Sequence, residues 1–64
     1  MASTGNRIEA RREALRLTRS QLAKLLKTTY LQVYRIETGK VRLQIKEVPV
    51  WAKALKLSPA ELVA

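Results

Sequence analysis

The sequence of 64 residues contains neither cysteine nor histidine. Without these residues the chain cannot form a disulfide, and it lacks the ligands from which zinc fingers are built. Glycine and proline are also scarce, with two of each, while helix-forming residues dominate. No apolar run approaches the roughly 18 residues of a membrane helix, and no signal-peptide pattern is present, so we expect a soluble cytoplasmic protein. These features exclude a metal-built or disulfide-linked fold and favour an all-α fold.

Basic residues outnumber acidic ones by thirteen to five, which gives a formal charge of +8. Such an excess favours a polyanionic partner. The alternative is a solvated basic surface that only aids solubility. Charge alone does not decide between the two, so the choice depends on the motifs.

The length fits one small domain spanning residues 1–64. Residues 1–6 are small and polar, and we expect them to be frayed. Within them, Ser3, Thr4 or Asn6 is available as a helix cap.

The clearest local pattern is a capping box that occurs twice. Thr18 with Gln21, and eleven residues later Thr29 with Gln32, have the spacing at which a hydroxyl and an amide satisfy free amide protons at a helix start. Two short helices in close succession pack at a steep angle and need a small residue where they cross, and Ala23 supplies it. This is the pattern of a helix-turn-helix motif, whose second helix enters the major groove of DNA.

Together, caps and apolar periodicity predict a compact bundle of four to five short helices. Pro49 falls inside the fourth; it is harmless in a helix that begins near Val48 but would bend one that begins earlier. Ser58 and Glu61 predict another capping box for the last helix. The expected helices are residues 7–16, 19–26, 30–38, a stretch within 43–57, and a short segment after Ser58.

An ordered set of residues resembles the phage repressor and Cro family, also called the XRE-type or lambda-repressor-like helix-turn-helix family. The resemblance covers roughly residues 7–62 and implies a bacterial or phage setting, in the bacterial cytoplasm or nucleoid or in a phage-infected host. The matching residues are Arg12, Leu17-Thr18, Leu22-Ala23, Val33, Ile36-Glu37, Gly39-Lys40, Ala52 and Ala54-Leu55.

Two structural expectations follow from the resemblance. Arg12 shares a helix face with Ile8, and a charge on an apolar face needs a partner. The resemblance implies that this partner is Glu37, whereas the alternative leaves both residues on the surface. At Lys27 the family usually has a glycine in the left-handed conformation, so the same backbone would cost on the order of 1 kcal/mol with lysine.

Side chains of the second motif helix that point away from Val33, Ile36 and Glu37 are the candidates for reading bases. Arg35 suits the two acceptors of guanine, while Gln32 suits adenine but is also needed for its capping box. The predicted base-contacting residues are Tyr30, Leu31, Gln32, Tyr34 and Arg35.

Contacts with the phosphate backbone are expected from the helix start, the turn and the loop that flank this face. Arg19 lies at a helix N-terminus, where amide protons already favour an anion. Such contacts position a protein on DNA without reading its sequence. The predicted phosphate-contacting residues are Thr18, Arg19, Lys27, Thr38, Lys40 and Arg42.

These expectations favour a sequence-specific regulator that binds double-stranded DNA, a repressor that acts as a homodimer on a palindromic site. A twofold patch would use Val50, Leu57, Leu62 and Val63, although Leu57 and Leu62 fit the core better. The alternative is a small helical protein-interaction module, such as an adaptor or antitoxin subunit. No enzyme, metal, cofactor, small-molecule ligand or membrane partner is expected, because the chain lacks histidine, cysteine and a glycine-rich phosphate loop.

Overall fold

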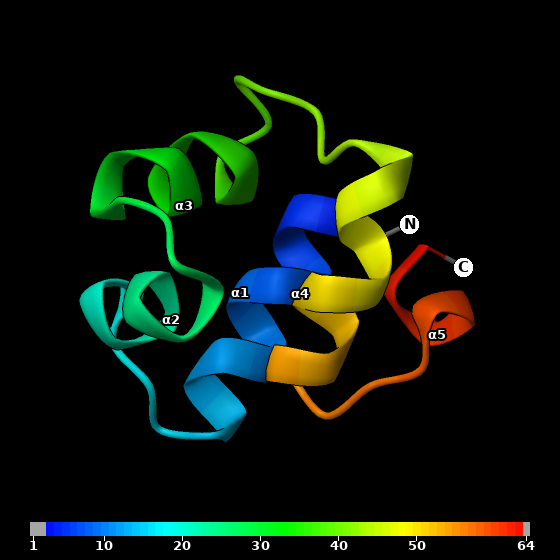
Figure 1. Ribbon diagram of the computed structural model, residues 1–64, viewed down its shortest axis with the longest axis horizontal. Coiled ribbons are helices and arrows are strands. Elements are labelled where there is room, and N and C mark those ends of the chain that lie inside the picture. The colour runs from blue at the N-terminus through cyan, green and yellow to red at the C-terminus, as the bar shows by residue number, and fades with distance from the viewer. Residues whose placement is uncertain (1–2, 64) are drawn as a thin grey trace.

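The protein folds as an all-α bundle in this computed structural model, which describes residues 3–63. In Figure 1, α2 and α3 lie together on one side, α1 and α4 lie centrally, and α5 lies on the other side of α4. No helix within residues 3–63 has the length and apolarity needed to cross a membrane. The elements are α1 (Thr4–Ala14), α2 (Arg19–Leu26), α3 (Tyr30–Glu37), the short 3-10 helix η1 (Ile45–Glu47), α4 (Val48–Ala54) and α5 (Pro59–Val63).

Helices α2 and α3 begin where the capping pattern predicts. The hydroxyl of Thr18 accepts from the amide N–H of Gln21, whose side chain accepts from the N–H of Thr18 in return, so this capping box is complete. At α3, the hydroxyl of Thr29 accepts from the N–H of Gln32 at 3.2 Å. The side chain of Gln32 makes no return bond in the described structure. The second pair therefore caps its helix with one hydrogen bond, and the Gln32 amide is left free for other contacts.

Helix α1 begins earlier than predicted. Ser3 caps it by accepting from the N–H of Asn6, and residues 4–6 are helical, so the expectation that they are frayed is wrong. Met1 and Ala2, the rest of that expected segment, lie outside the described residues. Gly5 explains the difference, because it is buried and anchors the helix start against α3.

The region around Pro49 resolves as two short elements. Because η1 ends at Glu47 and α4 begins at Val48, Pro49 lies in the first turn of α4, where it costs no hydrogen bond. Helix α5 opens with the predicted capping box, in which Ser58 and Glu61 exchange hydrogen bonds of 3.0 and 3.2 Å. The bond that the Ser58 backbone N–H donates to the Glu61 carboxylate, followed by the interaction with the Ser58 hydroxyl, lowers the pKa of the Glu61 carboxyl.

Four of the helices end in the same way. A residue in the left-handed conformation follows each of them. It is Arg16 after α1, Lys27 after α2 and Lys56 after α4, each with φ near +58°, and Gly39 after α3. Each is followed by an amide that donates back across the last turn, as the N–H of Thr28 does to the carbonyl of Ala23 at 2.9 Å. These are Schellman motifs, in which glycine is the usual left-handed residue. Lys27 thus has the left-handed backbone conformation that the resemblance implies, although the β-carbon of a lysine disfavours this conformation.

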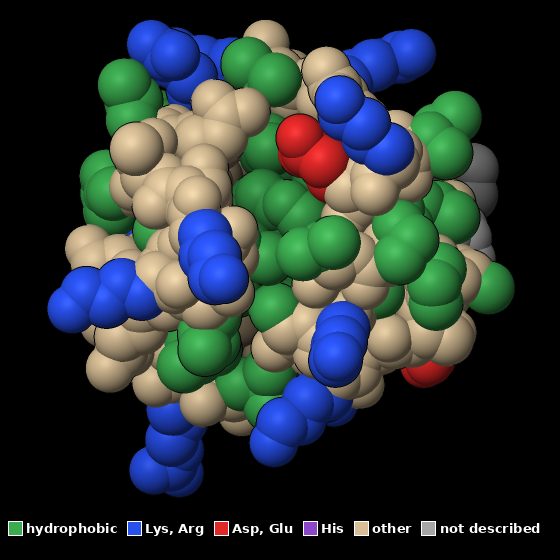
Figure 2. Space-filling view, viewed as in Figure 1, with side chains coloured by type: hydrophobic (Ala, Val, Ile, Leu, Met, Phe, Trp, Pro, Cys, Tyr) green, Lys and Arg blue, Asp and Glu red, His purple; other side chains and the backbone are tan. Residues whose placement is uncertain are grey.

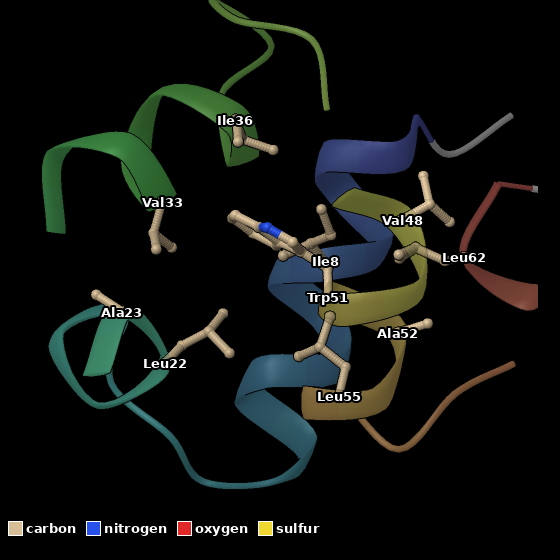
Figure 3. Close-up of a cluster of buried hydrophobic side chains, with 10 residues drawn as sticks. All are labelled: Ile8, Leu22, Ala23, Val33, Ile36, Val48, Trp51, Ala52, Leu55 and Leu62. Atoms are coloured by element: carbon tan, nitrogen blue, oxygen red, sulfur yellow. The ribbon is translucent and has the colours of Figure 1, made fainter. Parts of the chain in front are cut away.

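The core lies between the two motif helices and the α1–α4 pair. Trp51 of α4 extends into this space, with Val33 and Leu22 on the facing helices (Figure 3). Leu62 is fully buried and Leu57 packs against the core, so neither belongs to an exposed dimer patch. The buried hydrophobic residues are Ile8, Leu22, Ala23, Val33, Ile36, Val48, Trp51, Ala52, Leu55 and Leu62.

Gly5 marks the closest approach of two helices. A Cβ placed on it would lie 2.6 Å from the carbonyl oxygens of both Ile36 and Glu37. Both atoms belong to the backbone, so neither can move aside by changing a rotamer. The start of α1 therefore contacts the end of α3 directly, and only glycine allows this spacing.

We predict that Gly5→Ala destabilises the protein by about 1–3 kcal/mol, because the added methyl group must push α1 away from α3. The measurement is the urea midpoint with an unchanged m-value. Asn6→Ala is the matched control, since Asn6 is the exposed neighbour in the same turn. Equal effects of the two substitutions would contradict the close packing at Gly5.

Replacing Lys27 with glycine should have the opposite sign. Relief of the left-handed strain, roughly 1–2 kcal/mol, exceeds the entropy that glycine adds to the unfolded chain, roughly 0.5–1 kcal/mol. We expect Lys27→Gly to stabilise the fold by about 0.5–1 kcal/mol in urea unfolding. Lys24→Gly, in the last turn of the same helix, should instead destabilise it. A loss of stability in both variants would mean that Lys27 is not strained.

Candidate nucleic-acid interface

The outer face of α3 presents a mixed apolar and basic surface. Tyr30 and Leu31 are half exposed, at 50% and 49%, and Arg35 is exposed. Val33, Ile36 and Glu37 point inward and are buried. The helix thus has one face committed to the core and one face available for a partner, as its periodicity predicts.

Gln32 and Tyr34 lie at the two margins of this outer face and are partly buried. Gln32 lines an open hollow of about 520 Å³ between the α2–α3 turn and α4, beside Trp51 and Val50. Figure 2 shows one face of the molecule, on which hydrophobic side chains gather at the centre with Lys and Arg side chains among them and around the edges. Of the five predicted base-contacting residues, three are therefore exposed and two are partly buried.

Beneath α3, Glu37 and Arg12 form a buried ion pair. The Arg12 Nε donates to Glu37 Oε2 at 2.7 Å, and its Nη2 donates to Oε1 at 3.3 Å. The third nitrogen, Nη1, donates to the carbonyl of Leu17 at 2.8 Å. Both residues are at most 7% exposed, so this pair joins the inner faces of α1 and α3 away from water.

A second arginine, Arg19, shares the same carboxylate. Its Nε donates to Glu37 Oε1 at 2.8 Å, and its Nη2 donates to Glu9 Oε2 at 3.2 Å. The hydrogen bond to Glu37 raises the pKa of the Arg19 guanidinium above its usual range. Its guanidinium carbon also lies 5.2 Å from the centre of the Tyr34 ring.

Sequence reasoning missed these partners of Arg19. Glu9 is ten residues before it and Glu37 eighteen residues after it, so no helical spacing connects them. The available signal was that two arginines and a glutamate stand at the ends of three neighbouring helices. The edge of the Arg19 guanidinium that carries Nε and Nη2 is thus bonded to two carboxylates in the protein without DNA, and the phosphate contact of Arg19 stays a prediction.

The other predicted phosphate contacts differ in what they can donate. Thr18 uses its hydroxyl oxygen as an acceptor for the cap, which leaves its proton for a phosphate. Thr38 instead donates its hydroxyl proton to the carbonyl of Tyr34 at 2.8 Å, so that proton is already used. Lys27, in the turn before α3, and Lys40 and Arg42, in the segment after it, are exposed.

Within residues 3–63, no cluster of acidic residues has the arrangement needed to hold a metal ion. Exposed cations, a helix with one free face and a preceding helix packed across it define a different class of site. The fold and the site together are those of a helix-turn-helix domain. A family model for the helix-turn-helix domain matches residues 4–64, and the chain belongs to that family.

Among solved structures, the chain is similar to the P22 c2 repressor protein, in a crystal structure of its complex with synthetic operator 9T in the presence of Tl+. The two share 25% sequence identity with a TM-score of 0.90, and the match covers 98% of this chain and 96% of the other. The likeness to a phage repressor agrees with the family that the sequence resembles. A comparison with curated protein sequences finds no match.

We predict that Glu37→Gln destabilises the fold by about 3–5 kcal/mol, because it leaves two arginines without their shared counter-ion. In so small a domain this change should remove the cooperative helix signal at 25 °C. Glu13→Gln, on the exposed side of α1, is the control and should change stability by less than about 0.5 kcal/mol. If the two variants unfold at the same urea concentration, Glu37 contributes no net stability.

Proposed function

We propose that this protein is a transcription regulator that binds double-stranded DNA by placing the outer face of α3 in the major groove. The observation that carries the proposal is the exposure of Tyr30, Leu31 and Arg35 on one face of a helix whose other face is fixed by buried residues. The operator in the similar P22 c2 repressor structure supports the same mode of binding. A binding role of this kind requires no catalytic group.

In this proposal, the side chains on this face contact different parts of the DNA. Arg35 donates to a guanine, Leu31 packs on thymine methyl groups, and Tyr30 and Tyr34 contact bases or sugars at its margins. Gln32 reads adenine in this proposal, and the absence of a return capping bond from its side chain supports this role. The proposed phosphate contacts are Thr18, Lys27, Lys40 and Arg42. Thr38 is left out of this set, because its hydroxyl proton is donated to the carbonyl of Tyr34.

Dimer formation and repression belong to the same proposal. A domain of this size buries little surface on DNA, and two copies on a palindrome double the contact. Ile45, 89% exposed, and Val50, 55% exposed, are the apolar side chains at the start of the α4 region that a second copy would cover. Val50 and Val63 of the patch predicted from the sequence are exposed, Leu57 and Leu62 are not part of it, and Ile45 is an addition to it.

A second candidate function has one observation in its favour. Leu25, Tyr30 and Leu31 are exposed apolar side chains on the motif helices, and a protein partner of complementary shape would cover them. Their surroundings are basic, so such a partner would be acidic. An adaptor or antitoxin-like module is therefore the alternative to a DNA-binding regulator.

Selection from random double-stranded DNA tests the proposal. We expect an inverted repeat with half-site centres about 34–36 Å apart, or one helical turn, to be enriched. Enrichment of single half-sites only would remove the dimer from the proposal. If no DNA is retained even at low salt, the protein-partner function replaces it.

We predict that Arg35→Ala costs about 1–3 kcal/mol on the selected site and relaxes the preference at one base pair. Competition binding against single-base variants of the site measures both quantities. Lys40→Ala is the matched control: it should weaken all sequences equally and reduce the salt slope by about 1. An equal loss on every sequence for Arg35→Ala would assign Arg35 to a phosphate instead.

A further inference from the structure

The guanidinium of Arg19 contacts groups on two helices other than its own. One edge is occupied by carboxylates, with Nε on Glu37 of α3 and Nη2 on Glu9 of α1. Its carbon lies 5.2 Å from the centre of the Tyr34 ring. A planar guanidinium can accept both arrangements together, because its donors lie in the plane and its face is free to stack on an aromatic ring.

The contacts restrict both residues. The Arg19 side chain is only 24% exposed and is held by a carboxylate that is itself fully buried. The Tyr34 ring, packed against this fixed cation, has fewer orientations available than a ring on a free helix surface. Because Tyr34 lies at the margin of the outer face of α3, its orientation decides what its hydroxyl group reaches on a bound DNA.

The electrostatics of this cluster disfavour a phosphate contact by Arg19. Two arginines, Arg12 and Arg19, face two carboxylates, Glu9 and Glu37, so the four charges sum to zero. A neutral cluster attracts phosphate less than the exposed Lys40 or Arg42 does. Any phosphate near the edge of Arg19 would also approach two negative oxygens.

We propose that Arg19 is a positioning residue that acts through Tyr34 and Glu37, and that it sets the base preference contributed by Tyr34 instead of binding the DNA backbone. The proposal rests on the DNA-binding function given above. Arg19 fixes the end of α3 through the carboxylate of Glu37 and fixes the Tyr34 ring through its face. A single residue of α2 thereby controls the orientation of the recognition surface.

Binding measurements on the full chain test this. Arg19→Lys keeps the charge beside Glu9 and Glu37 but removes the planar face and the fork of donors. On the selected DNA site, we expect it to reduce discrimination by about three- to tenfold at the base pairs whose preference Tyr34→Ala also flattens. The salt slope should stay unchanged, while Lys40→Ala, measured alongside, lowers it by about 1.

The double variant separates an effect through Tyr34 from an independent one. Once Tyr34 is alanine, Arg19→Lys should cause no further loss of discrimination. Additive losses, or a salt slope lowered by about 1 with all base pairs weakened equally, would overturn the proposal and make Arg19 a phosphate contact.

A measurement on the free protein distinguishes failure of this proposal from failure of the DNA-binding function. In the folded chain without DNA, NMR resonances of the Tyr34 ring should shift in Arg19→Lys and in Arg19→Gln, and remain unchanged in Lys40→Ala. Unchanged Tyr34 resonances in both Arg19 variants overturn the positioning role. Selective DNA binding by the wild type is tested separately, and its absence would overturn the proposed function and the base preference with it.

Discussion

The carboxylate of Glu37 is the interaction on which the arrangement of the first three helices depends. It accepts hydrogen bonds from Arg12 of α1 and Arg19 of α2, at 2.7 to 3.3 Å, in a setting where its side chain is fully buried. A buried charge is tolerated only when its hydrogen-bonding capacity is used, and the described structure leaves no buried side-chain polar atom without a partner. The carboxylate also fixes the rotation of α3, because a turn by one residue, about 100°, would carry it away from both arginines. The buried carboxylate of Glu37 thus determines the direction in which the exposed face of α3 points.

The α-helices of the described structure are short, at five to eleven residues, and each would be only marginally stable in isolation. Hydrogen bonds at the helix ends compensate for this short length. Side-chain caps begin α1, α2, α3 and α5, and Schellman motifs end α1 to α4. Three of the left-handed residues are basic, and a cation at a helix C-terminus interacts favourably with the helix dipole. The β-carbon of the same residue destabilises the left-handed conformation. Arg16, Lys27 and Lys56 therefore add to the charge of +8 at a conformational cost that glycine would avoid.

Which features were predictable follows from how local their causes are. The starts of α2, α3 and α5 depend on residues three apart, and the sequence predicts them correctly. The Arg12–Glu37 pair required a family resemblance, since only the need of Arg12 for a partner is visible locally. Gly5 and the contacts of Arg19 depend on how separate helices approach one another. The exposure of Ile45 was not predictable, because the sequence leaves the start of the fourth helix open between a point near Val48 and an earlier one, and the 3-10 helix before α4 is what exposes Ile45.

The contacts of Arg19 bear on how such a domain acquires its DNA preference. If only the side chains on the outer face of α3 mattered, their identities would define the preferred site. Tyr34, however, packs against a cation that belongs to α2 and is held by carboxylates from α1 and α3. A substitution at Glu9 of α1 would then alter the orientation of the Tyr34 ring, which lies at the margin of the proposed DNA-binding face. Under the proposed function, sequence preference is for that reason a property of the packed helix-turn-helix unit and not of α3 alone.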